Sequence, residues 1–199
     1  MPDASAAQQP SPINLKDPIM AAFLAWLIPG LGHLYQGRIA KAVLFFVCIV
    51  GIYAYGVYLG GNSDLGYGRA VYFAFRNDEW RLPYICQIGV GLPSLPACVQ
   101  AMRMSNGKAV FFGGFMAPPC PIDSHGNKTL PENDANYQQP TLDKLLHDLN
   151  RYFELATFFT MVAGLLNVLA IYDAASGPVI LIPAKKEEQP DKSEKTEKS

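Results

Sequence analysis

The sequence predicts an all-α integral membrane protein with about four transmembrane helices, an antiparallel N-terminal hairpin, irregular loops and disordered tails. Residues 42–59 contain no charged side chain, and an apolar run of this length is a candidate membrane-spanning helix. Only 17% of the 199 residues are charged, compared with about 25% in a soluble domain. These charges collect in the loops and at both ends of the chain. The long apolar windows between them must be helical in hydrocarbon, because every backbone polar group there has to be bonded internally.

The composition gives no support to an enzyme or to a nucleic-acid-binding protein. The formal net charge is −1, so there is no basic field to attract nucleic acid. The four cysteines form no C-x-x-C pair, and His125 and His147 are isolated from other metal ligands in the sequence. The chain also lacks a P-loop, a dinucleotide-binding fingerprint and a G-x-S-x-G elbow. We therefore expect no catalytic residue, no metal and no cofactor.

The N-terminal part predicts a transmembrane hairpin over residues 19–60. Residues 1–18 are rich in Ala, Gln, Pro and Ser, which predicts a disordered tail. The first apolar segment covers about 19–35 and the second about 41–60, and so short a turn between them makes the two segments antiparallel neighbours. Pro29 and Gly30 kink or end the first segment, so a re-entrant half-helix is the alternative to a full span. Gly56 and Gly60 allow close helix contact, although the simpler interpretation is that they end the helix.

The middle of the chain predicts one further span between two loops. Residues 61–81 form an interfacial loop, because tyrosine and tryptophan favour the headgroup zone. Residues 82–102 are the third transmembrane segment, flanked by Arg81 and Arg103 at about the spacing of one span. Prolines within this segment must interrupt its helical hydrogen bonding. Residues 103–140 form a Gly/Pro-rich polar loop of irregular structure.

The C-terminal part predicts one long helix that begins in water or at the interface and continues into lipid. Thr141 is a candidate N-cap, and residues 141–182 combine an amphipathic helix with the fourth transmembrane helix at about 153–175. Residues 183–199 form a disordered charged tail. An even number of spans places both tails on one side. The Lys-rich end of the chain favours the cytoplasm for both of them.

Five residues of the first turn carry a resemblance to a known family. Gly32, His33, Tyr35, Gly37 and Arg38, followed by a long apolar helix, resemble the two-transmembrane-helix (TM-two) domain family. The whole chain also resembles an uncharacterised family of bacterial multi-pass membrane proteins. This resemblance implies a bacterial inner-membrane location and supplies no reaction, cofactor or catalytic residue.

A few polar residues are candidates for a functional role. His33 lies beside a glycine turn, so we expect His33→Ala to leave the protein inserted and folded. Asn167 is a polar group deep in the fourth span, which is typical of interhelical hydrogen bonds or of function. Asp173 lies near the end of that helix, where an acid opposes the helix dipole, and Arg38 is its candidate partner. The full set of motif and interaction candidates is Gly30, Gly32, His33, Tyr35, Gly37, Arg38, Asn167 and Asp173.

These observations leave two classes of function. The first is a non-enzymatic membrane protein that acts by helix–helix interaction or scaffolding, with the lipid bilayer, other membrane proteins or further copies of itself as partners. The alternative is a small transporter or channel subunit. A transport pathway needs several polar groups that face one another at mid-membrane. The two classes therefore differ in whether Gln87, Asn167 and His33 converge on a water-filled cavity.

Overall fold

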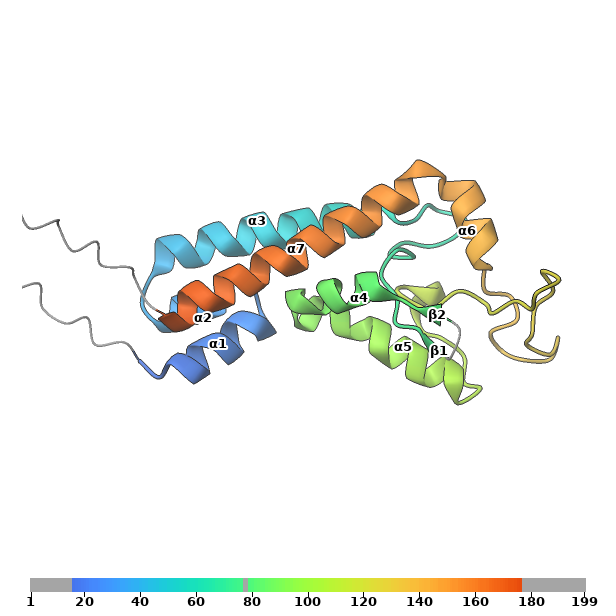
Figure 1. The fold of residues 1–199 in the computed structure, drawn as a ribbon, viewed down its shortest axis with the longest axis horizontal. Helices are drawn as coiled ribbons and strands as arrows, with labels where there is room; N and C mark the ends of the chain where they lie inside the picture. The colour runs from blue at the N-terminus through green and yellow to red at the C-terminus, as the bar shows by residue number, and fades with distance from the viewer. Residues whose placement is uncertain (1–15, 77–78, 177–199) are drawn as a thin grey trace, which may run out of the picture.

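A computed structural model describes residues 16–76 and 79–176. The regular structure of the described chain is almost entirely helical, and the molecule is elongated, with two long helices along its length and a smaller assembly at one end (Figure 1). Its helices are α1 (Pro18–Leu27), α2 (Leu31–Tyr35), α3 (Ile39–Leu59), α4 (Leu82–Gln87), α5 (Leu95–Ser105), α6 (Leu142–Leu149) and α7 (Arg151–Ser176). Short 3-10 turns are η1 (Ile88–Val90), η2 (Leu92–Ser94) and η3 (Phe112–Gly114). The predicted tails at 1–18 and 183–199 lie almost wholly outside the described residues.

Helices α3 and α7 are the only described helices long and apolar enough to cross a membrane. They confirm the helices predicted at 41–60 and 153–175. Helix α3 has 21 residues and α7 has 26, which at about 1.5 Å per residue matches or exceeds a hydrocarbon thickness of about 30 Å. The two helices pack against each other along much of their length (Figure 1).

The first apolar segment is not a continuous helix over 19–35. Helix α1 ends at Leu27, and the chain reverses through Ile28 and Gly30 into α2. Gly30 has φ +85°, and a Cβ there would overlap the carbonyl oxygen of Ala42, so the reversal requires glycine. Helix α2 returns to the level where α1 begins, since the Lys16 ammonium lies 5.1 Å from the centre of the Tyr35 ring. The segment thus has the form of the re-entrant alternative.

Residues 82–102, predicted as one spanning helix, instead form a helical hairpin. Helix α4 and η1 run in one direction, the chain turns at Gly91, and η2 and α5 run back (Figure 1). The hydroxyl of Tyr84 donates to the carbonyl of Ser94 at 2.9 Å, which ties the two arms together. The physical reason is that Pro93 and Pro96 lack backbone donors, while Gly91 takes a φ of +85° that other residues avoid.

The predicted long helix over 141–182 is broken at Asn150. The side chain of Thr141 accepts a hydrogen bond from the Lys144 amide and begins α6, as expected. Asn150 then takes φ 48° and ψ −130°, so α7 starts afresh at Arg151 in a different direction (Figure 1). The amphipathic helix and the apolar helix are therefore two elements. Residues 177–182 lie outside the described part.

The loops at 60–81 and 103–140 join α6 to form a cap at one end of the long helices. The strands β1 (Phe75–Arg76) and β2 (Glu79–Trp80) form a two-residue antiparallel ribbon within it. Residues 103–140 have little regular structure, as predicted, but buried amides hold them in place. The Asn136 side chain accepts from the Val110 amide at 3.1 Å and donates to the Lys108 carbonyl at 3.1 Å.

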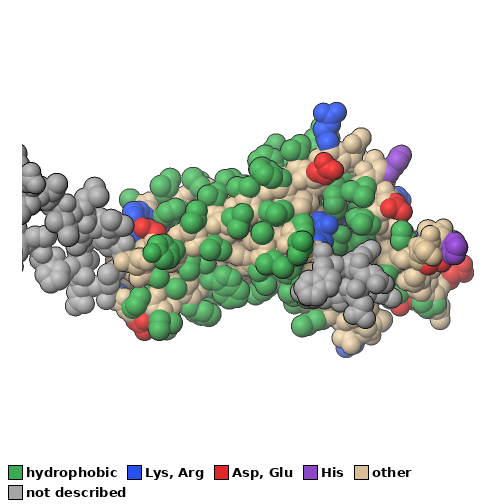
Figure 2. All heavy atoms as spheres, viewed as in Figure 1, with side chains coloured by type: hydrophobic (Ala, Val, Ile, Leu, Met, Phe, Trp, Pro, Cys, Tyr) green, Lys and Arg blue, Asp and Glu red, His purple; other side chains and the backbone are tan. Residues whose placement is uncertain are grey.

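The outer surface of the long helices is apolar, and their buried faces combine small residues with a few large ones such as Ile49 and Tyr53. Figure 2 shows hydrophobic side chains over this part of the molecule and charged side chains mainly toward its ends. A Cβ at Gly56 of α3 would lie 2.7 Å from the Thr160 methyl of α7, so Gly56 packs between the helices rather than simply ending α3. Small residues of this kind let helix backbones approach closely in membranes. The exposed apolar side chains on α3 and α7 include Val43, Leu44, Val47, Tyr55, Leu165, Val168 and Leu169.

Candidate functional site

One face of α7 carries small and polar residues at helical spacing. Its buried members are Phe153, Ala156, Thr160, Ala163, Gly164, Asn167, Ala170 and Ala174. Apart from the adjacent pair Ala163 and Gly164, gaps of three and four residues place these positions on one stripe of an α-helix. Every other described helix except α5 packs against α7. The stripe was readable in the sequence, and it is the signal that identifies the centre of the fold.

Polar residues of α7 make contacts at three successive levels along this helix. The first level joins α7 to α4. The side-chain amide of Gln87 donates to the Thr160 hydroxyl at 2.8 Å and to the Ala70 carbonyl at 3.3 Å. The Thr160 hydroxyl donates to the Ala156 carbonyl at 2.8 Å within its own helix. Gln87 and Thr160 are both fully buried. This level fixes α4 and the loop at Ala70 against α7.

The second level lies about two turns further along α7 and joins it to the two hairpin tips, at the end of α1 and at η1. The Asn167 side-chain amide donates to the Ala25 carbonyl at 3.1 Å and to the Gly89 carbonyl at 2.9 Å. Ala25 belongs to the last turn of α1, whose carbonyls have no partner within the helix. The Trp26 indole also donates to the Ile88 carbonyl at 3.2 Å. Asn167 thus satisfies acceptors from the two tips at once, in the role predicted for an interhelical polar group.

Replacing Asn167 with leucine should loosen both tips. The variant keeps a similar side-chain volume but leaves the carbonyls of Ala25 and Gly89 without their donor, which costs about 1–3 kcal/mol. We expect a lower thermal midpoint in detergent and faster thiol labelling of Cys86 on α4. The control is Val168→Leu, which changes an exposed neighbour on the same helix and should leave both readings unchanged. Equal midpoints for the two variants would contradict the assigned role of Asn167.

The third level is an ion-pair cluster at the C-terminal end of α7. The Asp173 carboxylate lies 2.8 Å from His33 Nε2, 3.0 Å from the Lys41 ammonium and 3.6 Å from the Arg38 guanidinium. Gln36 donates to the Ala174 carbonyl. These contacts bring the predicted partners Asp173 and Arg38 together. They also supply the positive charge that an acid at a helix C-terminus needs.

His33 is not a turn residue on the surface, as the sequence suggested, but a fully buried one. Its ring packs against Phe45 with 4.7 Å between ring centres, and its Nε2 atom bonds to Asp173. The pattern Gly-Leu-Gly-His places it on α2, which the reversal at Gly30 folds inward against α3 and α7. The local sequence gave no sign of this because the burial comes from segments distant in the chain.

The variant His33→Ala should therefore remain in the membrane fraction but lose stability. Helices α3 and α7 are unchanged, whereas a buried hydrogen bond to a charged group, worth about 1.5–3 kcal/mol, is lost. The matched control is His147→Ala, because His147 also lies 2.9 Å from an aspartate, Asp148, but its side chain is 89% exposed. Thermal unfolding of the three proteins in one detergent gives the comparison. Equal thermal midpoints for His33→Ala and His147→Ala would show that the pair of His33 and Asp173 contributes nothing to stability.

The other predicted residues lie at the turns that build this cluster. A Cβ at Gly32 would overlap the carbonyl of Ala21 and lie 2.7 Å from the Ala25 Cβ, so Gly32 allows α2 to pack on α1. Gly37 has φ +80° with open space around its Cα. The ring of Tyr35 faces the ammonium group of Lys16. The residues that sequence reasoning missed are Gln36, Lys41, Thr160 and Gly164, which bond or pack with segments far away in the chain.

Comparison with known families places the chain in a group whose role is not known. The model of DUF6677, a family of unknown function, matches residues 20–187. The chain belongs to the DUF6677 family. The match spans most of the described residues, from α1 to the end of α7. No curated protein and no solved structure matches the chain, and the TM-two resemblance stays a prediction.

Proposed function

We propose that this DUF6677 protein is a multi-pass protein of the bacterial inner membrane with two full spans. In this arrangement α3 and α7 cross the bilayer, α1–α2 enters from the face that carries both tails, and α4–α5 enters from the opposite face. The observation that carries the proposal is the uncharged apolar surface of the long helices, with charged residues gathered toward the ends (Figure 2). A soluble protein rarely exposes a continuous apolar area of this size. The proposal has two full spans rather than four, because each hairpin reverses direction within the hydrocarbon layer of the bilayer.

We further propose that its role is non-enzymatic and depends on helix–helix interaction. The interior polar groups support this role because Gln87, Asn167 and His33 each make a hydrogen bond to a distant segment of the chain, while one other polar atom of each side chain is buried without a partner in the described part of the chain. From Thr160 to Asp173 they are spread over roughly 20 Å of helix, at about 1.5 Å per residue. Gln87, Asn167 and His33 therefore do not converge, and each is fully buried. The ordered cap at the far end then offers a surface to another membrane protein or to a second copy.

The alternative, a transporter or channel subunit, is favoured by one feature. Two broken helical segments meet near the middle of the layer, and half-helices of this kind line binding sites in many transporters. Water accessibility at Asn167 separates the two roles. In a cysteine-free background that keeps Asn167, Ala170→Cys, one turn further along the buried face of α7, should resist a water-soluble thiol reagent, whereas Ser63→Cys in the exposed loop should react. Fast labelling at position 170 would favour the transport alternative.

Topology is tested by three single cysteines with a membrane-impermeant reagent on oriented vesicles. Two full spans place Ser63→Cys and Ser105→Cys on one face and Lys16→Cys on the other. Four spans would place Ser63 with Lys16 and opposite Ser105, so one labelling pattern decides between the two. Release of the protein from membranes by alkaline carbonate would overturn the proposal of an integral membrane protein. Stoichiometric self-association or a specific co-purifying membrane protein in mild detergent would support the interaction role.

A further inference from the structure

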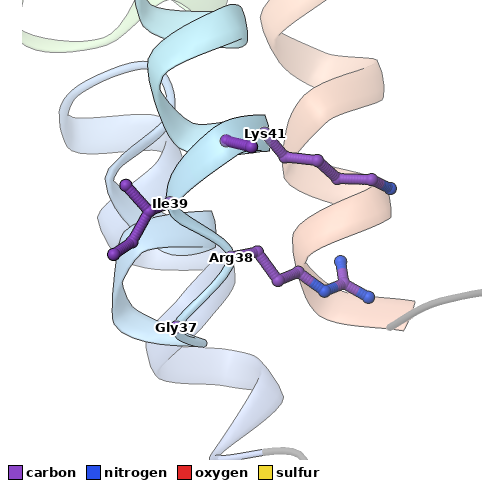
Figure 3. A pocket seen from close by; sticks show the side chains of 5 residues that line it. Gly37, Arg38, Ile39 and Lys41 are labelled. Atoms are coloured by element: carbon purple, nitrogen blue, oxygen red, sulfur yellow. The ribbon is translucent and has the colours of Figure 1, made fainter.

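A pocket lies at the beginning of α3, at the end of the molecule that carries both tails. It has a volume of about 350 Å³ and is lined by the consecutive residues 37–41 (Figure 3). Arg38 is the N-cap of α3, and no side chain caps the first-turn amides. The N-terminus of a long helix carries a partial positive charge and free N–H groups. The pocket is therefore suited to an anion.

Two cationic side chains add to this preference. In Figure 3 the side chains of Arg38 and Lys41 extend from the pocket in the same direction, toward the last turn of α7. Both reach the carboxylate of Asp173, at 3.6 Å and 3.0 Å. One carboxylate therefore faces two full positive charges, and Lys16 lies nearby above the Tyr35 ring. The pocket keeps a net positive charge that a single bound anion would offset.

An unpartnered donor at this end provides an independent observation. Among the described residues, Arg38 Nη2 is buried and has no hydrogen-bond partner. Buried polar atoms in proteins are nearly always paired. A guanidinium nitrogen left open beside a cation-lined pocket is the arrangement expected when a ligand oxygen completes the site.

The surroundings of the pocket fit one source of that anion. Ile39 is itself a lining residue and is 63% exposed, and Val43 one turn along α3 is 56% exposed. Phosphates of a bilayer lie just outside the hydrocarbon, at the depth where a spanning helix begins. Basic pockets between membrane helices bind anionic lipid headgroups. Exposed apolar side chains and cationic side chains lie at the same end of α3, on different sides of the helix (Figure 3).

We propose that this pocket binds the phosphate of an anionic phospholipid headgroup. Arg38 and Lys41 contact the phosphate oxygens together with the first-turn amides of α3, and Asp173 holds both cations in place. The bound lipid fastens α2 and α3 to the end of α7. The proposal rests on the membrane-spanning arrangement of α3 and α7 proposed above.

The test measures lipid retention by the full-length protein in nanodiscs or mild detergent with native mass spectrometry. Phosphatidylglycerol and zwitterionic phosphatidylcholine are the two probes. The wild type should retain phosphatidylglycerol at least five-fold better than phosphatidylcholine. Arg38→Gln with Lys41→Gln should abolish this preference, whereas Arg38→Lys with Lys41→Arg, which keeps both charges, should retain most of it. The matched control is Lys144→Gln with Arg151→Gln, which removes two exposed charges near the cap and should change nothing.

Each outcome bears on the proposal separately from the proposed topology. Equal retention by the Gln pair and the wild type would overturn the site, even if carbonate extraction and cysteine labelling support two spans. Displacement of the lipid by millimolar inorganic phosphate, with equal thermal stabilisation by phosphate alone, would overturn the lipid source. Circular dichroism of the Gln pair checks its helix content. If the pair fails to fold, the single variant Lys41→Gln, at a side chain 48% exposed, takes its place with an expected two- to three-fold loss.

Discussion

Substituting Gly164 with alanine is expected to be among the most damaging single changes in the protein. A Cβ at this position would overlap the carbonyl oxygen of Cys86 on α4, and a backbone atom cannot move aside as a flexible side chain can. Helix α4 must then separate from α7, which also weakens the hydrogen bond between Gln87 and Thr160. Overpacking of this kind costs at the upper end of about 1–3 kcal/mol. Thermal unfolding in detergent, followed by circular dichroism, measures the loss.

The control for this change is Gly51→Ala. Gly51 is also a helical glycine in a long apolar helix, but no atom lies within 4 Å of the Cβ it would carry. Alanine is a better helix former than glycine, so Gly51→Ala should leave the midpoint unchanged or raise it slightly. The pair therefore separates steric conflict from helix propensity. Equal midpoints for the two variants would show that α4 does not rest on α7 at Gly164.

The second large effect is expected for Arg69→Met. This substitution should destabilise the cap without unfolding α3 and α7. Arg69 is almost fully buried and donates to the Leu65 carbonyl at 2.6 Å, to Gln139 Oε1 at 2.8 Å and to the Gly113 carbonyl at 2.8 Å. Burial lowers the pKa of its guanidinium to about 10, so the group is still charged at neutral pH. Methionine preserves the volume and leaves three acceptors unpaired, at a cost of about 3 kcal/mol.

Hydrogen exchange and limited proteolysis measure the loss of stability in the cap separately from that in the long helices. Amides of residues 103–140 are expected to exchange at least ten-fold faster in Arg69→Met, whereas those of α3 and α7 keep their protection. Arg151→Met removes an exposed arginine outside the cap and serves as the control. Arg69→Lys keeps the charge but cannot reach all three acceptors, so it should give an intermediate rate. Uniformly faster exchange in α3 and α7 would mean that Arg69 supports the whole fold rather than the cap.

The sequence by itself determined where the two long apolar helices lie and the breaks near Gly30 and Pro93, but not the break at Asn150. A charge-free run fixes α3, because no other backbone form satisfies its polar groups in hydrocarbon. Pro29, Gly30 and Pro93 determined that helices must end where they do, since proline lacks a donor and glycine permits positive φ. The pairing of Arg38 with Asp173 also followed from charge at the helix ends. Each of these conclusions depends on a local property of the chain.

Only the tertiary structure decided where the chain goes after each break. A break at Gly91 is compatible with a kinked span or with a hairpin. The bond from the Tyr84 hydroxyl to Ser94 holds the two arms of the hairpin together, and Asn167, far along the chain, holds its tip against α7 through Gly89. The burial of His33 likewise depends on Asp173, 140 positions away. Hydropathy encodes which segments prefer lipid. Their direction and depth depend instead on which distant side chains satisfy the carbonyls and amides that a broken helix leaves open.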